Sequence, residues 1–111
     1  MPVDTDKRVR IVAALVNPVG PDESLETVML VNTTSAPVSL DGWKLTNQEN
    51  QSHALQGSVD ANLPLLVRLP DSFQLPNEGG TITLLNDEGV EVDGVTYTAA
   101  QAGEEGRTIV F

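Results

Sequence analysis

The densest group of acidic side chains lies between Asn86 and Asp93, and such carboxylates could bind a cation. Calcium takes six to eight oxygen ligands, so Asp87, Glu91 and Asp93 are the candidate ligands. Their spacing is not that of an EF-hand loop, and Glu91 and Asp93 fit the outward face of a strand. We therefore expect a charged hairpin, with no metal site and no cofactor.

His53 is the single histidine, and nucleophilic catalysis would pair it with a hydroxyl and an orienting acid. Ser52 is adjacent, but neighbouring residues of a strand point to opposite faces. The chain has no cysteine and no Gly-x-Ser-x-Gly elbow, and nothing indicates the cleft that paired hydrolytic carboxylates need. We expect a solvated His53 and no enzymatic activity.

Two polar loops, at 17–22 and 47–51, could carry recognition, since scaffolds place binding residues on loops. The candidate binding residues are Asn17, Pro18, Gly20, Asp22, Asn47 and Glu49. Asn and Asp side chains also bond to their own backbone, so these residues can instead simply fix the turns. Arg107 is expected to pair with Glu104, Glu105 or another carboxylate, and an anion-binding role is the alternative.

The chain has 111 residues and a net charge of −10, unevenly distributed. Residues 56–111 hold nine acids and two bases, whereas residues 1–55 hold seven acids and four bases. This field repels nucleic-acid phosphates and anionic membranes, and Lys7, Arg8 and Arg10 form too small a basic patch to reverse it. It favours a basic protein partner or simply solubility.

No apolar run approaches the ~20 residues of a membrane span, and residues 1–10 lack the pattern of a signal peptide. The cellular compartment stays open, because the chain could belong to a larger exported protein. We expect one domain, 1–111, and a monomer.

Alternating apolar residues and frequent turn signals predict about eight short strands and no long helix. In strand 8–16, Val9, Ile11, Ala13 and Leu15 are expected to share the core face. The predicted strands are 8–16, 26–32, 43–46, 52–55, 63–69, 81–86, one starting at Val90, and 107–111.

Two of these strands carry signals of their place in a sheet. Strand 26–32 is apolar on both faces and is therefore expected to be central. Strand 63–69 is expected at an edge, because Pro64 and Pro70 bracket it, with Leu63, Leu65, Val67 and Leu69 on one face.

The single tryptophan follows a turn signal, Asp41-Gly42, that can bend the chain into a new strand. Trp43 and Leu45 are two residues apart and so share a face. We expect Trp43 to be buried and to pin the core, and the alternative is an exposed binding anchor.

The clearest predicted hairpin turns at Asp87-Glu88-Gly89, with Gly89 in the position of a bulge. The returning strand changes phase, because Val95 and Tyr97 are an odd number of residues from Val92. A bulge at Asp93-Gly94 would return the later pair to the core. Residues 98–106 are expected to form a loop of small residues.

From about Ile11 to Ile109 the order of these signals resembles the lamin tail domain. The residues that carry the resemblance most clearly are Gly42, Trp43, Leu45, Gly79, Gly80, Gly89, Asp93, Tyr97 and Arg107. The pattern also includes Asn17-Pro18-x-Gly20-x-Asp22, Glu26-x-Val28-x-Leu30-x-Asn32 and Ile82-x-Leu84.

The resemblance implies an all-β, immunoglobulin-like β-sandwich with Greek-key connections. It also implies a non-catalytic protein-interaction or tethering module, an accessory domain of a larger bacterial polypeptide. The alternatives are a calcium-assisted surface adhesion domain and a nucleic-acid-binding module beside a nuclease or hydrolase. We expect binding to use the polar loops together with strand addition at the first or closing strand.

Overall fold

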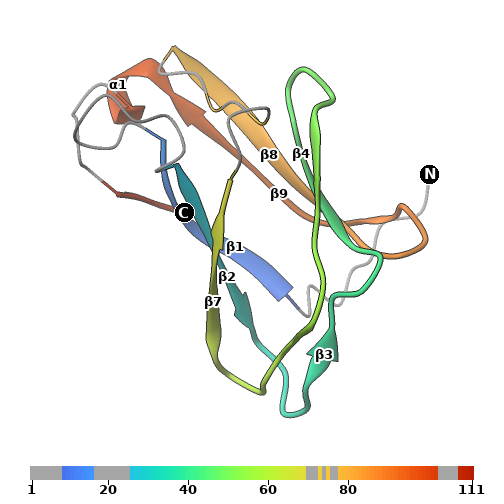
Figure 1. Ribbon diagram of the computed structural model, residues 1–111. Helices are drawn as coiled ribbons and strands as arrows, with labels where there is room; N and C mark the ends of the chain where they lie inside the picture. The colour runs from blue at the N-terminus through green and yellow to red at the C-terminus, as the bar shows by residue number, and fades with distance from the viewer. Residues whose placement is uncertain (1–8, 17–25, 70–72, 74, 76–77, 103–107) are drawn as a thin grey trace.

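The computed structural model describes residues 9–16, 26–69, 73, 75, 78–102 and 108–111, and these are mostly strands (Figure 1). The prediction of an all-β chain is confirmed. The elements are β1 (Val9–Leu15), β2 (Thr27–Asn32), β3 (Val38–Ser39), β4 (Lys44–Asn47), β5 (Ser52–Ala54), β6 (Ser58–Val59), β7 (Pro64–Arg68), β8 (Gly79–Leu85), β9 (Glu91–Thr98), α1 (Ala99–Ala102) and β10 (Ile109–Val110).

The described strands form two four-stranded antiparallel sheets and one short pair. The β2 sheet has the order β10-β1-β2-β7, the β8 sheet has the order β5-β4-β8-β9, and β3 pairs with β6. Side chains from both larger sheets meet in one core, which includes Ile11, Leu30, Leu45, Ile82 and Leu84. β2 has a neighbour on each side, so its predicted central position is confirmed.

The first strand changes face part of the way along. Its pairing with β2 shifts between Ile11 and Ala13, which marks a bulge. Val9 and Ile11 point into the core before the bulge, and Ala14 and Val16 do so after it. The prediction that Ala13 and Leu15 continue the core face is therefore wrong, because the extra residue turns them to the other side of the sheet, where Ala13 is still only 8% exposed.

β7 is an edge strand, as predicted from its flanking prolines. Val67 and Leu69 are buried on the core side, whereas Leu63 is 50% exposed. The prediction that Leu63 shares their face is wrong because Leu63 closes a turn before the strand begins. Its backbone N–H donates to the carbonyl of Asp60 at 3.2 Å.

The turn before Trp43 forms as predicted and delivers the ring into the core. The Trp43 N–H donates to the Leu40 carbonyl at 2.9 Å, and Gly42 has a φ of 83°, which favours glycine. Trp43 is 4% exposed, and Leu40 and Leu45 beside it are fully buried. A Cβ on Gly42 would lie 3.0 Å from the Cβ of Asp87, so this turn also packs against the β8–β9 hairpin.

The β8–β9 hairpin turns where predicted, but its bulge is nearer the turn. The Gly89 N–H donates to the Asn86 carbonyl at 3.0 Å, and Gly89 has a φ of 75°. Leu85 pairs with Glu91 and Leu84 pairs with Asp93, so Val92 is the extra residue. The predicted bulge at Asp93-Gly94 is wrong.

Helix α1 replaces part of the loop predicted at 98–106. Its first turn is a capping box, because the side chains of Thr98 and Gln101 each accept a backbone N–H from the other. The closing strand β10 pairs with β1, as its register of Ala13 with Val110 shows. β1 is therefore interior, and the prediction that it offers a free edge is wrong for this part of the strand.

Candidate functional site

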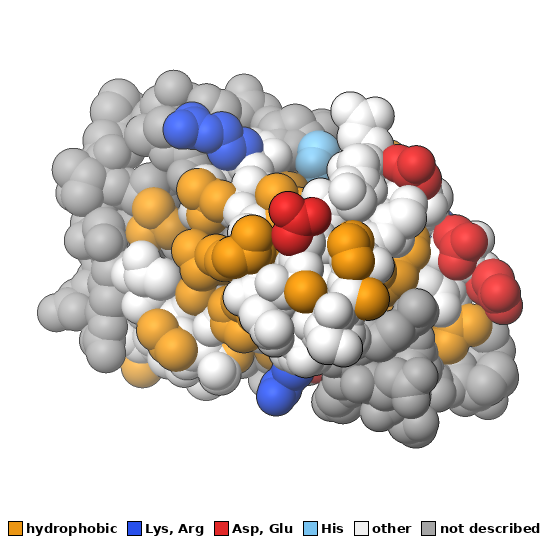
Figure 2. All heavy atoms as spheres, turned by 90° about the horizontal axis from the view of Figure 1, so that it is seen from below, with side chains coloured by type: hydrophobic (Ala, Val, Ile, Leu, Met, Phe, Trp, Pro, Cys, Tyr) orange, Lys and Arg blue, Asp and Glu red, His pale blue; other side chains and the backbone are white. Residues whose placement is uncertain are grey.

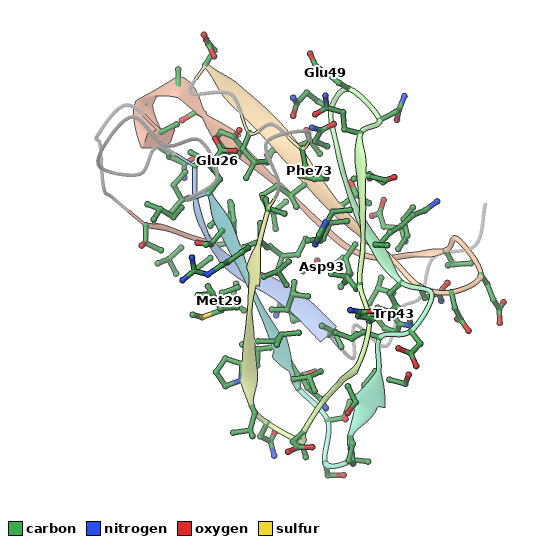
Figure 3. All side chains as sticks on the ribbon, viewed as in Figure 1. Glu26, Met29, Trp43, Glu49, Phe73 and Asp93 are labelled. Carbon is green, nitrogen blue, oxygen red and sulfur yellow. The ribbon has the colours of Figure 1, made fainter. Side chains whose placement is uncertain are left out.

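The loop prediction can be followed at residues 47–51, since Asn17, Pro18, Gly20 and Asp22 lie outside the described residues. Asn47 is only 6% exposed, and its Oδ1 accepts the backbone N–H groups of Glu49 and Gln51, both at 3.0 Å. Its side chain therefore holds the turn and is not available to a partner. Glu49 is exposed at the tip (Figure 3).

The same arrangement recurs at two other strand ends. Asn86 Oδ1 accepts from the Glu88 and Val90 N–H groups. Asn32 is fully buried, and it donates to the carbonyls of Ala36 and Val59 at 2.9 Å. Three buried or half-buried asparagines thus lie at the ends of strands and hydrogen-bond to backbone groups there. This supports the alternative in which the polar loop residues fix turns and do not bind a partner.

The candidate metal ligands do not converge. Asp93 is 4% exposed and points between the sheets (Figure 3), so its predicted outward position is wrong. The bulge at Val92 is the reason, because it brings both Val92 and Asp93 into the interior. Asp87 and Glu91 are exposed, and no cluster of three metal-ligating side chains exists among the described residues.

Asp93 joins the two sheets instead. Its Oδ2 accepts the Ile11 backbone N–H at 2.9 Å, across 82 residues of sequence. Ile11 pairs with Leu30, whose backbone groups bond to β7, so the Ile11 N–H points away from β2, toward the side where β10 pairs only with Ala13 and Ala14. A carboxylate is a strong acceptor, and this bond is the structural role of Asp93 that sequence reasoning missed.

The Tyr97 side chain fills the space beside Gly80, and the backbone of Tyr97 lies close to Gly79. It lies opposite Gly80 in the ladder, where a Cβ would be 2.8 Å from the Tyr97 hydroxyl oxygen. The side chain is 3% exposed. Burial raises the pKa of Tyr97 well above its usual value, and the negative charges of Glu26 and Glu78 raise it further.

His53 lies on the edge strand β5, opposite Leu45, and is half-buried. Leu45 points into the core and cross-strand partners share a face, so the imidazole lies on the core side of the edge. The side chain is therefore only partly exposed to the solvent that the sequence predicted around it. Ser52 is exposed on the other face, which leaves the two side chains apart.

Several residues with predicted roles lie outside the described residues: Lys7, Arg8, Pro70, Glu104, Glu105 and Arg107. Arg10 is exposed on the outer side of β1.

The most distinctive surface lies on the outer side of the β2 sheet, and we call it the outer apolar face. Ala13, Met29 and Leu66 form one row across three strands, and Val110 pairs beside Ala13. Leu66 is 51% exposed and Val110 is 76% exposed, far more than aliphatic residues in the core. Figure 3 shows Met29 pointing away from the interior, and Figure 2 shows several hydrophobic side chains exposed on the face that is seen from below.

A shallow depression of about 100 Å³ opens on this face. Its walls are almost wholly apolar or small, and the lining residues are Ala13, Ala14, Leu15, Thr27, Met29, Leu66 and Thr108. Cavities of ~150 Å³ hold a benzene ring, so this one suits a smaller aliphatic group. Ligand-binding pockets are typically ~300 Å³ or more, which makes a cofactor-sized occupant a poor fit.

Charged groups stand only at the margins of the outer apolar face, within the described residues. Arg10 and Arg68 are exposed at the two ends of its rows, where Arg10 pairs with Val31 and Arg68 pairs with Thr27. Several exposed acids lie instead on the β8 sheet and its loops: Glu49, Asp87, Glu88 and Glu91.

No family model and no curated protein matches this sequence. In the described part of the chain, no helix has the length and apolar character needed to cross a membrane.

Proposed function

We propose that this chain is a non-catalytic protein-interaction module that tethers a partner through the outer apolar face. The observation that carries the proposal is Leu66, which is 51% exposed at the centre of an edge strand and lines an apolar depression. Large exposed apolar groups that gather with others mark binding surfaces in soluble proteins. Here they lie on hydrogen-bonded strands, where ordering a flexible loop is not needed for binding.

The size of the depression supports a protein as the occupant. About 100 Å³ accommodates one aliphatic side chain of a partner, while the flat rows around it supply contact area. Such a central anchor surrounded by apolar contacts is the usual anatomy of a protein interface.

We also propose that the chain is a bacterial relative of the lamin tail domain and an accessory part of a larger polypeptide. The buried turn at Trp43 and the packing of Tyr97 over Gly80 support this proposal, since both occupy the positions that the resemblance singles out. Two facing antiparallel sheets are compatible with an immunoglobulin-like sandwich.

The net charge of −10 adds a preference for a partner with a basic surface. This preference acts at long range, because opposite charge steers the encounter and raises the association rate. The contact itself is apolar, so we expect added salt to slow association more than it speeds dissociation.

Affinity capture from a lysate of the source organism tests this function with two matched variants. Leu66→Asp puts a charge on the outer apolar face, and Thr96→Asp puts the same charge at an exposed position on β9. We expect the wild-type chain and Thr96→Asp to retain the same partner, and Leu66→Asp to lose it. Equal capture by all three folded proteins would refute the role of this face.

A further inference from the structure

The four outer edges of the two sheets are not equally protected. β5 has three residues and β10 has two, so each offers little backbone for pairing. β9 packs against β1, to which Asp93 is bonded, and it carries the exposed carboxylate of Glu91. β7 is the remaining edge, with five residues and three consecutive aliphatic side chains, Leu65, Leu66 and Val67.

Within the described part of the chain, the backbone groups of β7 that lie outside its ladder with β2 can be assigned from that pairing. The Asn32 N–H donates to the Leu63 carbonyl, and the Leu69 N–H donates to the Glu26 carbonyl. Antiparallel pairing alternates, so the odd-numbered residues of β7 bond to β2 and the even-numbered residues point outward. Leu66 and Arg68 thus present N–H and C=O groups to the open edge, and Pro64 presents a C=O group alone.

We propose that β7 pairs with β7 of a second copy of this chain, in an antiparallel register centred on Leu66. The two Leu66 residues then exchange both of their N–H···O=C bonds across a twofold axis. Each Arg68 N–H meets the Pro64 carbonyl of the other copy, and the missing N–H of Pro64 limits the pairing at both ends. The two β2 sheets join into one continuous sheet.

Charge favours a second copy over other strands as the occupant. A strongly basic strand would meet Arg68 at the edge, whereas β7 of a second copy brings one positive charge and no carboxylate to the contact, and salt screens the repulsion between the two copies as a whole. β7 itself is apolar with its single charge at one end. In the proposed register the two Arg68 residues are offset by four positions, roughly 13 Å along the strand. That exceeds the Debye length of ~8 Å at physiological salt, so their repulsion is weak.

Self-association goes beyond the proposed function and extends the outer apolar face across the axis. Each Leu66 side chain projects from that face, so the two copies place these side chains next to each other. The same residues of each copy meet at the axis, as an isologous interface requires, and the two outer apolar faces become one larger face.

Sedimentation equilibrium over a range of protein and salt concentrations tests the proposal. We expect a reversible monomer–dimer equilibrium that strengthens with salt, because screening reduces the repulsion between two copies of charge −10. Leu66→Pro removes the central N–H groups while keeping an apolar side chain, and its N–H faces away from β2, so folding tolerates it. The variant should weaken dimerisation about tenfold or more, whereas Leu66→Val should retain it.

A disulfide tests the register, because the chain contains no cysteine. Antiparallel partners at a bonded position have Cα atoms ~5.5 Å apart, within the range that a disulfide spans. We expect Leu66→Cys to form a covalent dimer rapidly, and Thr96→Cys to do so slowly. A monomer at every concentration, or a dimer indifferent to Leu66→Pro, would overturn the proposal. If the chain stays monomeric but captures a partner that Leu66→Asp loses, the inference fails while the proposed function stands.

Discussion

Removing the carboxylate of Asp93 should destabilise the fold more than removing any exposed acid. The side chain is 4% exposed, and its Oδ2 accepts the buried Ile11 N–H at 2.9 Å. Asp93→Ala deletes the acceptor but leaves the buried Ile11 N–H donor in place.

The expected magnitude follows from this geometry. A hydrogen bond to a charged group contributes ~1.5–3 kcal/mol, and a buried N–H left unsatisfied costs ~1–3 kcal/mol. These figures describe the same loss from two sides and are not added, so we expect Asp93→Ala to lower the free energy of unfolding by about 2–3 kcal/mol. Asp93→Asn keeps an acceptor oxygen and should cost less, about 1 kcal/mol.

Urea unfolding followed by Trp43 fluorescence measures the difference. The matched control is Glu91→Ala, two residues away and exposed, which should change stability by less than ~0.5 kcal/mol. If Asp93→Ala is as stable as Glu91→Ala, the Ile11 N–H has another acceptor and the proposed link between the sheets is refuted.

Four further predictions follow from buried groups and from the dispersed acids. Trp43→Ala should cost ~3–5 kcal/mol in urea unfolding, because it removes a large core side chain, and a red-shifted emission in the folded protein would contradict its burial. The unfolded chain loses the tyrosine proton near pH 10.0, while burial raises the pKa of folded Tyr97. The free energy of unfolding should therefore fall as pH rises above 10.0, by up to ~1.4 kcal/mol per pH unit. Urea titrations at several pH values should show this decline, and Tyr97→Phe should flatten it. Asn86→Ala should lower the free energy of unfolding in urea by ~1–2 kcal/mol, since two backbone N–H groups lose their acceptor. An unchanged unfolding midpoint would argue against this role of Asn86 in the turn. Thermal unfolding with calcium and with chelator should coincide, because Asp93 points inward while Asp87 and Glu91 stay exposed; a saturable upward shift would indicate a site.

The features that could be predicted from sequence are those encoded locally. Gly42 predicted the turn before Trp43, because a bend with a positive φ favours glycine. The burial of Trp43 could be predicted because a large aromatic side chain is stabilised in the core. The Asp87–Gly89 hairpin and the central position of β2 were likewise visible in turn residues and apolar pattern.

The features that could not be predicted depend on partners distant in sequence. Asp93 accepts the Ile11 N–H from 82 residues away, and neither residue alone indicates this bond. The bulge in β9 lies at Val92, one step from the predicted place, which is enough to reverse the direction of Asp93. Alternation locates strands reliably but not the extra residue that changes their phase.

The candidate site was missed for a related reason. Met29 and Val31 indicated a strand covered on both faces, but in the described chain their face of the sheet has no covering layer. Leu66 was assigned no role, because the alternation of Leu65 and Val67 pointed to the opposite face as the core. At the start of α1, Thr98 and Gln101 have the spacing of a capping box, a signal that is easy to overlook because the helix has only four residues.

The affinity of the captured protein for two variants tests the central claim most directly. Titration of that partner against the wild-type chain, Leu66→Asp and Thr96→Asp measures the contribution of the outer apolar face at constant net charge between the variants. We predict that Leu66→Asp weakens binding at least about tenfold, the cost of placing a charge in a desolvated contact, and that Thr96→Asp matches the wild type. Equal affinity of both variants for the partner would contradict the assignment of this face.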